Sequence, residues 1–172
     1  MCKYYFLKHI INEGDIFIPF EYGDSIELLR DNKDSKLKKI PFVGKNETDY
    51  YSITGHVVSN DFKNFLEINK IPNIEFVSID FLNKKNKKLS AFSIRFTNTE
   101  DCIDYEKSDV VIILDKIREI NKIYFKKDFN AKFFLIKGYD YEIVINNELK
   151  DEMEKNNIKG ISFTLIDENY KF

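Results

Sequence analysis

The feature that most constrains this chain is a segment that occurs twice. VVSNDFKNFLEINKIPNIEFVSID, residues 57–80, has the same pattern as VINNELKDEMEKNNIKGISFTLID, residues 144–167. The two segments align without a gap at a constant offset of 87 residues, so that Ser59 matches Asn146. Two amphipathic units that converged by chance are the alternative. We favour an internal duplication, which predicts two helix–strand units that bury their apolar faces in one fold.

Each copy predicts a helix followed by a strand. Ser59 and Asn146 are good helix N-caps, because their side-chain oxygens can accept a backbone N–H of the first turn. The helical spacing then predicts these core-facing residues: Phe62, Phe65 and Leu66 in the first copy, and Leu149 and Met153 in the second. Pro72 ends the first helix, and Asn156-Asn157 is suited to end the second.

Alternating apolar residues predict several strands around these helices. The expected strands are Lys3–Lys8, Asp15–Phe20, Ile74–Phe81, Ser90–Asn98, Ile120–Phe125, Lys132–Gly138 and Ile161–Asp167. Ser108–Ile117 is ambiguous between strand and helix, a short helix is expected after Asp24, and Asp31–Lys39 is expected to form a loop. The predicted fold class is α+β: an antiparallel-rich sheet with a duplicated helix–strand unit in one compact domain, residues 1–172. Its repeat units are predicted near 57–81 and 144–168.

Composition excludes several classes of protein. The net charge of -2 argues against a nucleic-acid-binding protein, which usually has a strongly basic face. No window approaches the roughly 20 apolar residues of a membrane span. Cys2 and Cys102 do not make a disulfide framework, and the N-terminus lacks the apolar run of a secretion signal. We therefore expect a cytoplasmic protein that does not bind nucleic acid or membrane directly.

The residues of common catalytic and metal sites are sparse. His9 and His56 lie in no catalytic motif, and with Cys2 and Cys102 they match no structural zinc spacing. The six glycines form no phosphate-binding loop. The sequence therefore predicts no enzyme, no cofactor and no metal.

Carboxylates are the one concentrated polar feature. They gather in the segment TEDCIDYEKSD, residues 99–109, and along the second predicted helix. A solvated surface is one interpretation, and an acidic surface that attracts a basic partner is the other. On the second interpretation the candidate partner-binding residues are Asp101, Asp104, Glu106, Glu148, Asp151, Glu152 and Glu154.

Three blocks of the sequence resemble a family of bacterial immunity proteins of polymorphic toxin systems, first catalogued as a domain of unknown function. The C-terminal block carries the likeness at Phe134, Gly138, Val144, Ile145, Leu149–Met153, Gly160 and Phe163. The middle block carries it at Asn98, Asp104 and Ser108, and the first repeat carries it at Ser59, Leu66 and Phe76. The resemblance covers about residues 57–167.

This resemblance implies a protein that binds and neutralises a cognate toxin by occluding it, and it implies no catalytic residues. Two other functions are kept open by the residues themselves. One is a small enzyme of unrecognised type with a carboxylate site around Asp104, which would require a carboxyl of raised pKa. The other is a homo-oligomeric interaction module that pairs through an exposed strand edge, for which Asp15–Phe20 is the candidate. The oligomeric state and the identity of the toxin do not follow from the sequence.

Overall fold

A computed structural model describes residues 2–19, 40–52, 55–83 and 85–166. The helix expected after Asp24 and the loop expected at Asp31–Lys39 lie outside these residues. The chain forms two compact units. Unit 1 consists of residues 1–8, 98–157 and 163–172, and unit 2 consists of residues 9–97 and 158–162.

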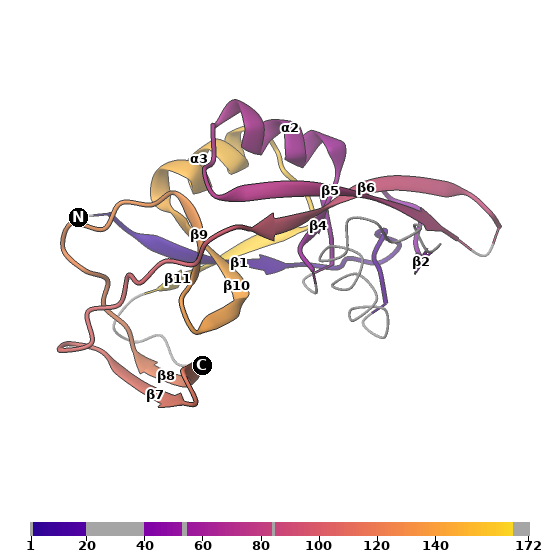
Figure 1. The fold of residues 1–172 in the computed structure, drawn as a ribbon. Coiled ribbons are helices and arrows are strands. Elements are labelled where there is room, and N and C mark those ends of the chain that lie inside the picture. The colour runs from indigo at the N-terminus through magenta and orange to yellow at the C-terminus, as the bar shows by residue number, and fades with distance from the viewer. Residues whose placement is uncertain (1, 20–39, 53–54, 84, 167–172) are drawn as a thin grey trace. The chain divides into compact units, whose positions relative to one another are not determined.

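Unit 2 is built on a five-stranded sheet (Figure 1). Its strands are β2 (Ile40–Pro41), β3 (Tyr50–Ser52), β4 (Val57–Val58), β5 (Ile74–Leu82) and β6 (Lys88–Phe96), in the order β2-β5-β6-β4-β3. The helix α2 (Asn60–Ile68) connects β4 to β5, and β6 lies between these two strands and antiparallel to both. The helix buries Phe62, Phe65 and Leu66, as its apolar spacing predicts.

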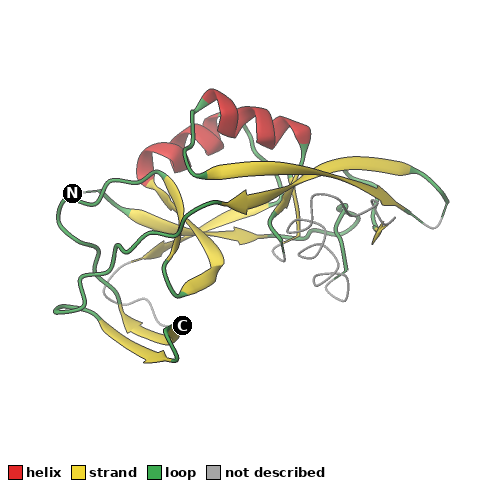
Figure 2. Cartoon of the chain, viewed as in Figure 1, coloured by secondary structure: helices red, strands yellow, loops and turns green. Residues whose placement is uncertain are grey.

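Unit 1 contains a four-stranded sheet in the order β11-β1-β10-β9. Figure 2 draws the strands in yellow and the helices in red. Its strands are β1 (Tyr4–His9), β9 (Phe133–Ile136), β10 (Tyr139–Asn146) and β11 (Ile161–Ile166). The helix α3 (Asn147–Lys155) connects β10 to β11, and β1 lies between these two strands. A separate hairpin is formed by β7 (Asp109–Ile113) and β8 (Lys116–Lys122).

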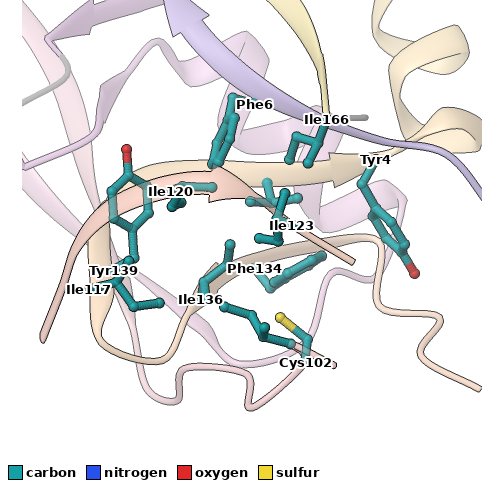
Figure 3. Close-up of a cluster of buried hydrophobic side chains, with 12 residues drawn as sticks. Tyr4, Phe6, Cys102, Ile117, Ile120, Ile123, Phe134, Ile136, Tyr139 and Ile166 are labelled. Carbon is teal, nitrogen blue, oxygen red and sulfur yellow. The ribbon is translucent and has the colours of Figure 1, made fainter. Parts of the chain in front are cut away.

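The core of unit 1 is shared by the sheet, the hairpin and the acidic segment. Figure 3 shows that Ile117, Ile120 and Ile123 point into the same cluster as Phe6 and Tyr139. The full cluster of buried residues is Tyr4, Phe6, Cys102, Ile103, Ile117, Ile120, Ile123, Phe134, Ile136, Tyr139, Val144 and Ile166. The β8 strand is therefore fixed to unit 1 by burial of its apolar side chains.

The predicted fold class is confirmed, because the fold is α+β with antiparallel-rich sheets. Both predicted N-caps are present, since the Ser59 side chain accepts the N–H of Phe62 and the Asn146 side chain accepts the N–H of Leu149. The ambiguous segment becomes a strand and a hairpin turn. The expected strand Ile120–Phe125 instead begins earlier, at Lys116, and ends at Lys122.

The prediction that Asp15–Phe20 forms an exposed strand edge is wrong for residues 15–19, the part of the segment that the structure describes. Ile16 and Ile18 are buried, and Phe17 exchanges backbone hydrogen bonds of 3.1 Å with Val43. Ile18 also donates its N–H to the carbonyl of Tyr51. These non-local contacts satisfy the backbone from both sides, which an alternating pattern of apolar residues cannot reveal.

Candidate functional site

The acidic segment is held to unit 1 through its backbone. Glu100 donates its N–H to the carbonyl of Leu135 over 2.8 Å, and Ile103 forms a bridge with Phe125. Cys102 and Ile103 are buried, whereas Asp101 and Glu106 are exposed. The segment therefore presents its carboxylates outward from a fixed backbone.

A tight turn positions the middle of this segment. The backbone N–H groups of Lys107 and Ser108 both donate to the carbonyl of Asp104, over 3.2 and 3.0 Å. The ammonium group of Lys107 lies 2.5 Å from the Asp104 carboxylate, and this hydrogen bond holds the pKa of Asp104 below its usual value. The same bond raises the pKa of Lys107. Asp104 is thus an ionised, paired carboxylate.

The other predicted acidic residues are also paired with lysines, with one exception. Asp101 lies 3.1 Å from Lys126, and on α3 the pairs are Glu148 with Lys132, Asp151 and Glu154 with Lys150, and Glu152 with Lys155. Only Glu106 of the seven has no ion-pair partner among the described residues. Exposed pairs of this kind contribute little stability and are screened by salt. The acidic groups other than the partly buried Asp104 are therefore exposed, and most of their charge is compensated by a nearby lysine.

This geometry disfavours the carboxylate-enzyme alternative. A general acid at neutral pH needs a carboxyl of raised pKa, and the pKa of Asp104 is lowered. Within the described part of the chain, no three His, Cys, Asp or Glu residues lie together as metal ligands do. None of the described helices has the length and apolar character needed to cross a membrane.

The histidines and the buried cysteine have structural surroundings. His56 is buried, and its Nδ1 lies 2.8 Å from the hydroxyl of Tyr50. Burial lowers the pKa of His9, which packs edge-on against the Tyr50 ring. Burial also raises the pKa of Cys102 to about 12, so this thiol stays protonated and unreactive at neutral pH.

Sequence reasoning missed the surface that the β7–β8 hairpin forms. The run VVIIL, residues 110–114, is apolar throughout, yet Val111, Ile112, Ile113 and Leu114 are all exposed. Leu114 at the hairpin turn is 87% exposed, the highest value among the large apolar residues that are exposed. Such a run is ordinarily a buried strand, and contiguous exposed apolar residues mark interaction surfaces.

The hairpin turn holds this surface in a defined place. Leu114 and Asp115 have positive φ values of 51° and 59°, as a two-residue type I′ turn requires. Ile117 donates its N–H to the carbonyl of Gly138 over 2.8 Å, and a Cβ at Gly138 would lie 2.9 Å from the carbonyl oxygen of Asp115. The turn therefore packs directly on the glycine, which has no side chain to displace it.

One signal in the sequence could have found this hairpin. An apolar run that ends in Leu-Asp and continues into an alternating segment is compatible with a two-residue turn, although Asn-Gly is the usual signature. Leucine is so uncommon at positive φ that the pattern favoured one continuous element. The turn was therefore not predicted, because leucine rarely occupies a position of positive φ.

Comparison with known proteins supplies the last piece of evidence. No curated protein matches the sequence significantly. The model of the immunity protein family (Imm11) matches residues 8–168, which is nearly the whole length and both compact units. The resemblance inferred from residues 57–167 is thereby confirmed and extended toward the N-terminus. This chain belongs to the immunity protein family Imm11.

Proposed function

We propose that the protein neutralises a cognate bacterial toxin by binding it directly and occluding its active site. The single observation that carries this proposal is the family match over residues 8–168. The lowered pKa of Asp104 also supports a binding role over a catalytic one. No cofactor is needed for inhibition by occlusion.

We further propose that the acidic residues contribute to toxin binding from unit 1. The group comprises Asp101, Asp104, Glu106, Glu148, Asp151, Glu152 and Glu154. Their lysine partners can be exchanged for cations of the toxin at small cost, because exposed ion pairs are weak. Charge complementarity of this kind accelerates association and makes it depend on salt. Glu106 is the strongest candidate, since it has no ion-pair partner to exchange within the part of the chain that the structure describes.

Co-expression with the C-terminal domain of the protein encoded by the neighbouring gene, the expected toxin, tests the proposal. We expect the wild-type protein to rescue growth and to co-purify with that domain. A wild-type protein that neither rescues growth nor forms a complex would contradict the proposed function itself.

Charge reversal then tests the acidic residues. The variant Asp101→Lys, Asp104→Lys, Glu106→Lys is expected to weaken binding about tenfold or more at low salt and to reduce its salt dependence. A matched control reverses Glu13, Glu47 and Glu67, three exposed acidic residues of unit 2. Equal binding by both variants across a salt titration would show that the acidic segment is not part of the interface.

A further inference from the structure

We propose that the outer edge of β7 is the docking strand for the toxin, and that it pairs with an extended toxin segment whose apolar residues are flanked by Lys or Arg. The proposal rests on the function proposed above and identifies the surface and the mode of binding. It is carried by the backbone geometry, the exposure and the charges of residues 109–115.

The first observation is that β7 is an edge strand. It pairs with β8 alone among the described residues, in an antiparallel register from Asp109 opposite Lys122 to Ile113 opposite Lys116. Its other edge therefore presents backbone N–H and C=O groups that a second strand can bond. Exposed edges of this kind invite pairing with another chain, and natural proteins usually protect them with charges, prolines or coverings.

The second observation is that β7 carries none of that protection beyond Asp109 at its start. Charged residues stand at its two ends, Asp109 and Asp115, and the five residues between them are apolar. Val111 and Ile113 lie opposite Glu119 and Lys116 on the hairpin, and Ile113 is 52% exposed. A strand edge with apolar side chains provides both main-chain hydrogen bonds and side-chain pockets, as in recognition by strand addition.

The third observation is the placement of Leu114. A leucine at φ 51° is held in a conformation that glycine or asparagine adopts more readily. Its side chain is nevertheless 87% exposed, so it is not packed into a core by the residues that the structure describes. A residue held in an unfavourable conformation with its apolar side chain in solvent is suited to insert into a partner's pocket.

The charges identify the kind of partner. Three carboxylates of the hairpin form no ion pair in the described ranges: Asp109, Asp115 and Glu119. Among the hairpin cations, Arg118 is the one that likewise forms no ion pair in those ranges. The apolar edge is therefore bounded by carboxylates that form no ion pair in the described ranges, with Glu106 just before it. A segment with cations at both ends of an apolar strand would complement all of these features.

The same charges disfavour a second copy of this chain as the occupant. Two β7 strands that paired antiparallel with their apolar runs fully overlapped would centre on Ile112. Asp109 of one copy would then lie opposite Asp115 of the other, at both ends of the pair. Like charges placed directly opposite each other destabilise a strand pair. A basic, heterologous strand is thus the better match.

The key variant is Leu114→Asn. Asparagine tolerates positive φ, so the turn is expected to fold at least as well as with leucine. The matched control is Ile68→Asn, which removes an apolar side chain that is 79% exposed at the end of α2 in unit 2. Binding to the purified neighbouring toxin domain is expected to weaken about tenfold or more for Leu114→Asn and to stay within about twofold for the control.

Two further variants separate the apolar edge from its charges. Ile113→Lys places a cation on the exposed face of the edge and is expected to weaken binding more than Leu114→Asn does. Asp109→Asn with Asp115→Asn keeps the side-chain shape and is expected to weaken binding several-fold and to reduce its salt dependence. Circular dichroism and thermal melts of each free variant verify that the fold is intact.

Hydrogen exchange reports the mode of binding directly. Strand pairing predicts slower exchange for amides of residues 110–114 in the complex, and unchanged exchange at Ile68. Undiminished binding by Leu114→Asn and Ile113→Lys, without added protection of β7, would overturn the docking site while leaving the proposed function standing. Self-association that Ile113→Lys abolishes, with toxin binding unaffected, would instead assign the edge to a second copy of this chain. Absence of any wild-type complex would refute the proposed function, and with it the toxin as the occupant of β7.

Discussion

The two helix–strand copies have the same local construction, although their surroundings differ. In each copy the helix joins two strands that flank a third, giving β4-α2-β5 around β6 and β10-α3-β11 around β1. Val58 pairs with Phe92, and Ile145 pairs with Tyr5. Ile145 lies 87 residues after Val58, whereas Tyr5 lies 87 residues before Phe92. The central strand β6 follows the first copy in the sequence, whereas the central strand β1 precedes the second copy.

The likeness extends to individual contacts. Lys63 lies over the rings of Phe76 and Phe92, at 5.5 and 5.3 Å. Lys150, its equivalent, lies over the rings of Tyr5 and Phe163, at 5.6 and 5.4 Å. Both lysines also pair with a glutamate four residues later on the helix. These matched details support the internal duplication that we propose from the sequence.

The two copies differ in their buried helix faces and in the elements that accompany them in each unit. The helix of the first copy buries two phenylalanines and a leucine, whereas the helix of the second buries one leucine and one methionine. Unit 1, which holds the second helix, also carries the acidic segment and the β7–β8 hairpin between β6 and β9. Unit 2 therefore has the larger aromatic helix face, and unit 1 has the exposed apolar edge.

The largest effect is expected from shortening matched core residues. Phe62→Ala in α2 should destabilise the protein by about 3–5 kcal/mol, and Leu149→Ala in α3 by about 2–5 kcal/mol, because each leaves a cavity in a buried site. Denaturant titrations followed by circular dichroism measure both. A smaller loss for Phe62→Ala than for Leu149→Ala would contradict the comparison of the two helix faces.

Labelling of Cys102 shows whether the two units unfold together, as we expect for one domain. Cys102 is fully buried in unit 1, and Cys2 is exposed, so a Cys2→Ser background leaves one reporter. Phe62→Ala lies in unit 2 and should accelerate labelling of Cys102 if unfolding is cooperative. Unchanged labelling in a protein with a destabilised unit 2 would show that the units unfold separately.

The N-caps are expected to give intermediate and unequal effects. Ser59→Ala and Asn146→Ala each remove a cap at a cost of about 1 kcal/mol. Ser59 also donates its hydroxyl to Asp49 over 2.7 Å, so its loss removes a second hydrogen bond and should be the more costly. The conservative variants Ser59→Thr and Asn146→Asp retain a capping oxygen and serve as controls. Equal losses for the two alanine variants would show that the Asp49 contact contributes nothing.

The smallest effect is expected from the matched lysines. Lys63→Met and Lys150→Met keep the apolar stem over the aromatic rings and remove the charge. Each should cost roughly 0.5–1 kcal/mol, from the cation–π contacts and the helical ion pair. Thermal melts at low and high salt separate the two contributions, since salt screens the exposed ion pair. A large loss of stability for one of the two lysine variants only would show that the equivalent contacts do not contribute equally to stability.

The sequence by itself determined the local structure of the repeat. Ser59 and Asn146 begin the helices and Phe62, Leu66, Leu149 and Met153 face the core, because capping and helical periodicity act within a few residues. The acidic candidates are exposed except for Asp104, which is partly buried, and their role in binding stays a proposal. The pairing of Asp101 with Lys126 was not anticipated, because folding alone brings these two residues together.

The roles of β1, β7 and residues 15–19 follow from contacts that form only in the folded chain. Tyr5 lies opposite Ile145, and Phe17 exchanges backbone hydrogen bonds with Val43. The role of each segment therefore depends on a partner that is distant in the sequence. The apolar run 110–114 looked like core, but β8 takes the buried position and leaves β7 at the edge. Strand order and exposure are set by which segments compete for the same face of a core, and that competition has no local signature in the chain.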